Sequence, residues 1–99
     1  MVKDIDGINV HYEVKGSGKY VFILHGWGAN ISVYRSVADL LSQKFTVVSL
    51  DFPGFGGTAE PPEVWSVSDY AAFTVKFIAS FGVKEVILFG HSFGGREII

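Results

Sequence analysis

The chain has no cysteine and little that would mark a nucleic-acid or membrane protein. Without cysteine it can form neither a disulfide nor a thiolate metal site. The chain has eight basic and ten acidic residues, and they do not form runs of one sign. The basic patch or stripe of a nucleic-acid-binding protein is therefore not indicated. The apolar stretches are far shorter than the about 20 residues that span a bilayer, and residues 1–6 carry charges where a signal peptide needs an apolar segment. We expect a cytoplasmic protein with no nucleic-acid or membrane partner.

Motifs for metals and nucleotides are also missing. The three histidines do not fall at metal-ligand spacing with one another or with a carboxylate on one helix face. The glycine-rich segment 54–57 lacks the G-x-G-x-x-G spacing and reads as a turn, and no G-x-x-x-x-G-K-[ST] motif occurs. The sequence therefore implies no metal and no cofactor.

Apolar and aromatic residues are abundant instead. Hydrophobic residues make up 48% of the chain, with nine Phe and two Trp among its 99 residues. A free-standing domain this small has a large surface to keep hydrated. The excess suggests that these residues form the interior of a larger domain.

The hydrophobic pattern first predicts a β-hairpin. Asp6-Gly7 is a strong two-residue turn signal, and in residues 8–14 apolar side chains alternate with polar ones. This alternation is typical of an antiparallel strand with one wet face, on which we expect His11 to be solvated. Three apolar runs, residues 20–24, 45–50 and 86–89, are each typical of a buried strand.

Helices are predicted between these strands. Residues 34–41 and 70–81 place apolar side chains at helical spacing, and Gly82 follows the second stripe as a predicted C-cap. Buried strands joined by helical crossovers indicate a parallel sheet covered on both sides. The predicted fold is therefore α/β: a mostly parallel sheet with an N-terminal antiparallel hairpin and helices on both faces.

The most informative motif directly follows the last strand. Gly90-His91-Ser92-Phe93-Gly94 is a G-x-S-x-G sequence between a strand and a predicted helix. A turn this sharp strains the central residue and leaves room only for glycine two positions to either side. The strain presents the Ser92 hydroxyl above the sheet, as a nucleophile requires.

Three motifs in order resemble the N-terminal half of the α/β-hydrolase family. They are Leu24-His25-Gly26-Trp27-Gly28, Asp51-Phe52-Pro53-Gly54-Phe55-Gly56 and Gly90-His91-Ser92-Phe93-Gly94-Gly95, each after a predicted strand. The resemblance implies that residues 1–99 are the N-terminal part of a hydrolase domain, ending just after the nucleophile turn. It also implies a serine hydrolase that cleaves ester-like or carbon–carbon bonds through an acyl-enzyme on Ser92.

The resemblance further assigns roles around Ser92. The backbone N–H groups of Phe93 and Trp27 would form the oxyanion hole, and Gly26 and Gly28 would let the Trp27 loop approach closely. His25 would hold this loop by hydrogen bonds. His91 diverges from its neighbour Ser92 at the sharp turn and is not expected to act as base, while Asp51 is expected to anchor the Pro53-Gly54 turn.

The family places an acid and then a histidine after the nucleophile, and neither partner is expected within this chain. A dehalogenase or an epoxide hydrolase would carry Asp at position 92, so Ser92 argues against both, whereas perhydrolase chemistry stays open. Trp27, Phe93 and Trp65 suggest a small apolar acyl or aromatic substrate. The alternative is a non-catalytic module that self-associates through the exposed sheet edge of strand 86–89.

Overall fold

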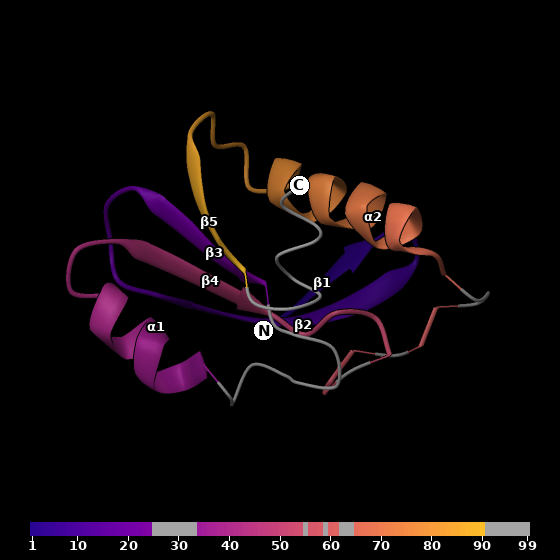
Figure 1. Ribbon diagram of the computed structural model, residues 1–99, viewed down its shortest axis with the longest axis horizontal. Helices are drawn as coiled ribbons and strands as arrows, with labels where there is room; N and C mark the ends of the chain where they lie inside the picture. The colour runs from indigo at the N-terminus through magenta and orange to yellow at the C-terminus, as the bar shows by residue number, and fades with distance from the viewer. Residues whose placement is uncertain (25–33, 55, 59, 62–64, 91–99) are drawn as a thin grey trace.

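The computed structural model describes residues 1–24, 34–54, 56–58, 60–61 and 65–90. Its elements lie along the chain in the order β1 (Val2–Ile5), β2 (Ile8–Lys15), β3 (Tyr20–Leu24), α1 (Arg35–Leu41), β4 (Thr46–Leu50), α2 (Val67–Ala79) and β5 (Val86–Gly90). The hairpin followed by alternating strands and helices is the order that the sequence predicts (Figure 1).

The N-terminal hairpin turns at Asp6-Gly7, as predicted. β1 and β2 pair antiparallel with Ile5 opposite Ile8, so only two residues lie between the strands. Both turn residues have positive φ, 51° for Asp6 and 84° for Gly7. Positive φ at both central positions is the conformation that matches the twist of the flanking strands and that Asp-Gly favours.

The five strands form one mixed sheet in the order β1-β2-β4-β3-β5. β3 pairs parallel with both β4 and β5, and β2 pairs antiparallel with β4. Parallel strands need crossover connections, and these contain α1, in the chain from β3 to β4, and α2, in the chain from β4 to β5. The predicted fold class, a mostly parallel sheet with an antiparallel hairpin, is confirmed.

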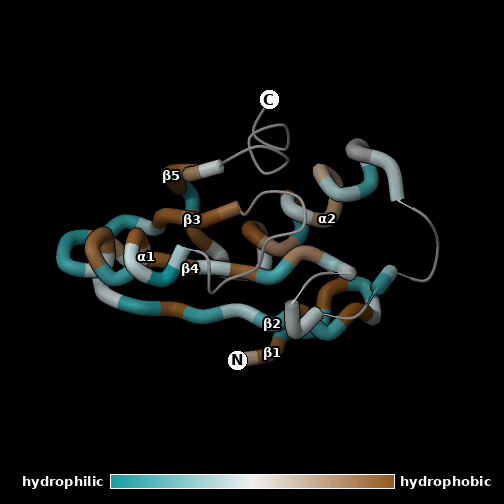
Figure 2. Tube along the Cα trace, turned by 60° about the horizontal axis from the view of Figure 1, so that its bottom comes forward, coloured by the Kyte–Doolittle hydropathy of each residue, from teal (hydrophilic) through white to brown (hydrophobic). Residues whose placement is uncertain are grey.

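The two helices cover opposite faces of the sheet (Figure 1). On the α1 side, Ala38 packs with Ile23 and Val47. The core on the α2 side is larger and rich in aromatic rings, and Phe22 and Phe77 are fully buried there. Figure 2 shows the hydrophobic colour along β3 and on β5, the strands whose sequences are almost wholly apolar.

α2 begins and ends with recognisable caps. The Ser66 side chain accepts a hydrogen bond from the Asp69 backbone N–H, and the Asp69 side chain accepts one from the Ser66 backbone N–H. At the other end, Ser80 is the C-cap in the right-handed helical conformation. The prediction that Gly82 caps the helix is therefore wrong: Gly82, with φ of 68°, ends the turn that follows the cap.

β5 differs from the predicted buried strand. It lies at the edge of the sheet, and Ile87 and Phe89 remain 45% and 39% exposed. Alternate side chains of a strand point to opposite faces, and these two share the face of α1. α1 packs mainly against β4, and Tyr34 at its N-cap contacts the Phe89 ring, so the described residues cover this face of β5 only in part.

Candidate active site at the carboxyl edge of the sheet

The carboxyl ends of β3, β4 and β5 meet at one edge of the sheet (Figure 1). Leu24 and Gly90, the last residues of β3 and β5, are direct register partners. On the other side of β3, Ile23 is paired with Ser49 of β4. Adjacent strands lie about 4.8 Å apart, so the chain leaves β3 and β5 at neighbouring points. In open α/β sheets, ligands bind outside the carboxyl ends of the strands, and this edge is the candidate site.

Most of the predicted site residues directly follow these two strand ends. Gly90 is described as the last residue of β5, and the nucleophile motif continues from it. The other predicted residues lie outside the described residues: His25, Gly26, Trp27, Gly28, His91, Ser92, Phe93 and Gly94. Their roles stay predictions, but the described register brings the starting points of the Trp27 loop and the Ser92 turn next to each other.

Asp51 directly follows β4 at the same edge and is almost fully buried, with 2% exposure. Its Oδ2 accepts hydrogen bonds of 2.8 Å from the Gly57 backbone N–H and from Nδ1 of His11. Asp51 therefore anchors the loop after β4, as the sequence suggested, but its hydrogen bond reaches Gly57, beyond the expected Pro53-Gly54 turn. The Pro53 carbonyl accepts a hydrogen bond from the Tyr70 hydroxyl at 3.0 Å.

The prediction that His11 is merely solvated is wrong. Its side chain is 33% exposed and donates through Nδ1 to Asp51, because an ionised carboxylate can only accept. Its backbone N–H also donates to Oγ1 of Thr58 at 2.9 Å. The alternation in β2 does place His11 on the face opposite Tyr12, but that face is covered here by the loop after β4. Two adjacent glycines in that loop, Gly56 and Gly57, were the signal for such a close approach.

His11 and Asp51 have the arrangement of a general base and the carboxylate that orients it. Their position on the sheet is far from the end of β5, Gly90. β2 is separated from β5 by β4 and β3, which amounts to three strand spacings, or about 14 Å. A histidine side chain cannot span that distance to a group at the end of β5.

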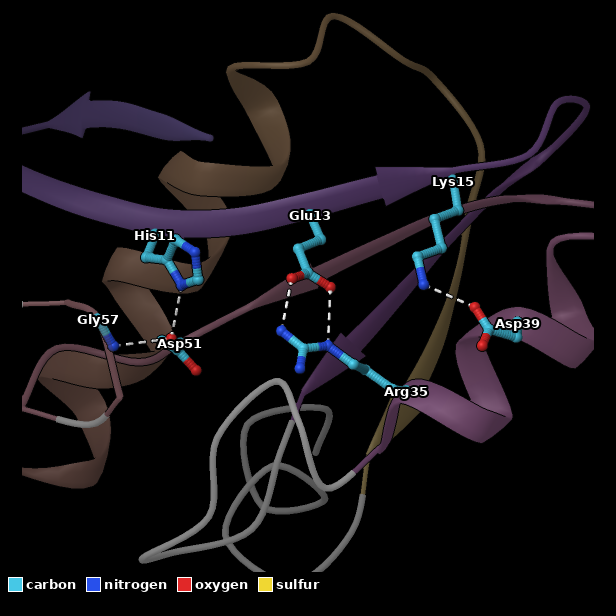
Figure 3. Close-up of polar contacts among 7 residues, drawn as sticks. All are labelled: His11, Glu13, Lys15, Arg35, Asp39, Asp51 and Gly57. Carbon is cyan, nitrogen blue, oxygen red and sulfur yellow. Dashed lines mark hydrogen bonds and ion pairs between the residues drawn. The ribbon is translucent and has the colours of Figure 1, made fainter.

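The face of β2 on the side of α1 carries a row of polar side chains. Figure 3 shows His11, Glu13 and Lys15 pointing from the strand toward charged partners on α1 or after β4. Arg35, the first residue of α1, binds both oxygens of Glu13, at 2.8 Å and 3.5 Å. This hydrogen bonding lowers the pKa of Glu13 and raises the pKa of Arg35. These pairs join α1 and the loop after β4 to the same strand.

The described residues hold no group of three or more histidine, cysteine or acidic side chains that could bind a metal ion. Nor is any helix in the described ranges long and apolar enough to cross a bilayer.

Comparisons with known proteins place this fold in a family. The family model for the alpha/beta hydrolase fold matches residues 19–98. An acetyltransferase component of the acetoin cleaving system of Cupriavidus necator is 34% identical over 93 residues, which are 93% of this chain and 25% of that protein. A fluoroacetate dehalogenase from Burkholderia is 32% identical, over 94% of this chain and 32% of the relative.

A solved structure agrees with these sequence relatives. The epoxide hydrolase VrEH1 from Vigna radiata superposes with a TM-score of 0.89 at 29% identity, over 95% of this chain and 32% of that chain. The chain thus spans about a third or less of the length of these relatives. Because the family model covers most of its residues, the chain belongs to the alpha/beta hydrolase fold family.

Proposed function

We propose that the chain carries the nucleophile of a serine hydrolase, with Ser92 as the attacking group. The observation that carries the proposal is the register of Leu24 opposite Gly90, which starts the predicted oxyanion loop and the nucleophile turn from neighbouring strand ends. Family membership supports the same assignment of the G-x-S-x-G motif. We further propose that residues 1–99 are the N-terminal part of the complete hydrolase domain.

In the proposed reaction, Ser92 Oγ forms a bond to the carbonyl carbon of the substrate while the carbonyl π electrons move to oxygen. The hydroxyl proton passes to a histidine base supplied from outside residues 1–99. Two backbone N–H groups, of Trp27 and Phe93, stabilise the oxyanion, each worth roughly 2.7–4 kcal/mol of barrier. Collapse of this intermediate expels the protonated leaving group and leaves an acyl-enzyme, which water hydrolyses.

The identity of residue 92 separates this chemistry from that named for two relatives. One relative is a fluoroacetate dehalogenase and one is an epoxide hydrolase. The resemblance implies aspartate at the nucleophile position in both classes, whereas this chain has Ser92. A serine alkoxide forms and releases an acyl group, so we propose a small ester-like or carbon–carbon substrate with an apolar acyl or aromatic part.

Labelling with an aryl alkylphosphonate tests the nucleophile. We expect a slow adduct at Ser92 in the native chain, because oxyanion hole and binding alone leave about 10³–10⁴-fold catalysis when a triad is incomplete. Peptide mass spectrometry locates the adduct. The controls are the chain labelled while unfolded in guanidinium and the Ser92→Ala variant. Equal labelling of native and unfolded protein, or labelling that survives Ser92→Ala, would contradict the proposal.

A second candidate function is self-association through β5. It is favoured by the edge position of this strand and by the exposure of Ile87 and Phe89 on one face. An apolar strand edge is a template for pairing with another chain. Two copies related by a two-fold axis perpendicular to the sheet would pair β5 antiparallel and place both exposed faces on the same side.

Sedimentation velocity measures this association directly. We expect a concentration-dependent dimer that Ile87→Lys weakens at least tenfold. Val75→Lys is the matched control, because Val75 is also an exposed apolar residue, 66% exposed, but lies on α2. A monomer at all concentrations, or equal effects of the two substitutions, would rule the module function out.

A further inference from the structure

We propose that His11 and Asp51 are positioning residues that hold the loop after β4 as a fixed wall of the substrate site. The described part of this loop, residues 51–54 and 56–58, leaves the same carboxyl edge from which the nucleophile motif continues. The inference rests on the proposed function, because the loop is a substrate wall only if the reaction takes place at this edge.

The anchor is the buried carboxylate of Asp51, whose Oδ2 accepts two hydrogen bonds. Asp51 Oδ2 accepts from the Gly57 N–H and from His11 Nδ1, each at 2.8 Å. A charge as buried as Asp51 is costly unless it is hydrogen-bonded, so the carboxylate draws both donors toward it. The Thr58 hydroxyl adds a tie to β2 by accepting from the His11 backbone N–H. The far end of the loop is thus bound to β2 through His11.

The loop backbone lies directly on this pair, which explains its two glycines. At Gly56, with φ of 52°, a Cβ atom would collide with the Asp51 carboxylate. At Gly57, a Cβ atom would come to 3.0 Å from the His11 ring. Position 56 therefore requires glycine, whereas a side chain at position 57 would force the His11 ring to shift by a few tenths of an ångström. The sequence indicates only a turn at Gly56 and Gly57, whereas the structure shows that the backbone there lies against the side chains of Asp51 and His11.

The near end of the loop is held on the other face of the sheet. Phe52 is fully buried in the core beside Tyr70, and the Tyr70 hydroxyl donates to the Pro53 carbonyl at 3.0 Å. Pro53 is thus tied to α2, and Gly57 is tied to His11 through Asp51, so the loop is anchored at two points. An anchored loop limits the size of the acyl group that the site accepts. The pair His11 and Asp51 should therefore affect how tightly bulky acyl groups bind and leave the rate of the chemical step unchanged.

Amide hydrogen exchange of the 99-residue chain, followed by NMR, tests the anchor without any chemistry. His11→Phe keeps a ring but removes the donor, so we expect the Gly57 amide to exchange at least about tenfold faster, as the loss of a charge-assisted hydrogen bond implies. His11→Asn places an amide N–H near the position of Nδ1 and should keep the rate within about threefold. Glu13→Gln is the matched control on the same face of β2 and should leave Gly57 unchanged.

If His11→Phe does not fold, Thr58→Val removes only the acceptor of the His11 N–H and is expected to speed Gly57 exchange by about threefold. An unchanged Gly57 rate in the folded variants overturns the positioning role. This result does not depend on Ser92, so it is distinguishable from a failure of the proposed function, which would show as equal labelling of native and unfolded protein or as labelling that survives Ser92→Ala.

The wall is tested by the concentration dependence of phosphonate labelling at Ser92. For a probe with a bulky alkyl group, His11→Phe should raise the half-saturating concentration by about tenfold and leave the maximal rate within threefold. For a methyl phosphonate both values should stay within threefold. His11→Asn should restore the half-saturating concentration of the bulky probe to that of the native chain. A fall in maximal rate for both probes alike, or no change for the bulky probe, would overturn the wall.

Discussion

Gly7 and Gly16 have nearly the same backbone conformation, with φ of 84° and 83°, but very different surroundings. An added Cβ atom at Gly7 would meet nothing within 4 Å, whereas at Gly16 it would collide with the backbone carbonyls of Ser42 and Phe45. Left-handed backbone costs a residue with a side chain roughly 1–2 kcal/mol. At Gly16 the collision with backbone atoms adds to that cost.

We therefore predict that Gly7→Ala lowers the free energy of unfolding by about 1–2 kcal/mol. Gly16→Ala should lower it by about 3 kcal/mol or more, because overpacking adds to the conformational cost. Urea denaturation of the two variants measures both values. Equal losses would show that the backbone conformation alone, and not the close approach of residues 42–45, requires glycine at position 16.

The single residue Glu13 provides a prediction of how the free energy of unfolding depends on pH. Hydrogen bonding from Arg35 lowers its pKa in the folded chain, so the pair stabilises the fold above the pKa of the unfolded chain. This contribution is lost as the pH falls through the lowered pKa. The unfolding free energies of the native sequence and Glu13→Gln should therefore differ at pH 7 and converge at strongly acidic pH.

Denaturation curves between pH 7 and about pH 2 follow this difference, since unperturbed glutamate titrates near pH 4.3. Glu85→Gln serves as control, because Glu85 forms no ion pair with the described residues. A difference between Glu13→Gln and the native sequence that does not change with pH would contradict the ionic origin of the pair.

At the scale of elements, the start of α2 depends on its reciprocal cap. Ser66→Ala removes the side-chain acceptor of the Asp69 N–H and should cost about 1 kcal/mol of stability. Ser68 is exposed within the same first turn, and Ser68→Ala should change stability by less than about 0.5 kcal/mol. Thermal unfolding measures the loss of stability in both variants. A neutral Ser66→Ala would mean that packing alone defines the start of the helix.

The elements themselves follow well from the sequence, because their signals are local. The Asp6-Gly7 turn, the strands of residues 20–24 and 46–50, and the apolar stripe of α2 each require only a pattern within the segment. The burial of β5 was predicted wrongly because it depends on what covers the strand, and Ile87 lies at an edge where α1 does not reach. The end of α2 was misplaced because Gly82 marks the following turn.

The site at the carboxyl edge was only partly predictable for a related reason. Three motifs after three strands show which residues lie at that edge, and the structure confirms that Leu24 and Gly90 are neighbours. The contact between His11 and Asp51 joins residues 40 positions apart, one on β2 and one just after its antiparallel neighbour β4. No local pattern reports such a pair, although the adjacent glycines at 56 and 57 show that some side chain lies beneath the loop.

For the whole molecule, the aromatic core on the α2 side supplies the main support. Phe77 is fully buried and contacts Tyr12, Phe22 and Phe81 edge to face. Phe77→Ala should cost about 3–5 kcal/mol. Domains of this size are stable by only about 5–15 kcal/mol, so the variant should lose a large share of its stability and unfold at a markedly lower temperature. Val75→Ala on the exposed face of α2 should be almost neutral by circular dichroism.

The proposed function depends most on one predicted arrangement: the Ser92 hydroxyl and two backbone N–H groups for the oxyanion lie together where β3 and β5 end side by side. A crystal structure of the phosphonate-labelled chain tests it most directly. We predict phosphorus bonded to Ser92 Oγ, with the phosphoryl oxygen within hydrogen-bonding distance of the backbone N–H groups of residues 27 and 93. A phosphoryl oxygen that faces solvent, or an adduct away from the ends of β3 and β5, would contradict the account.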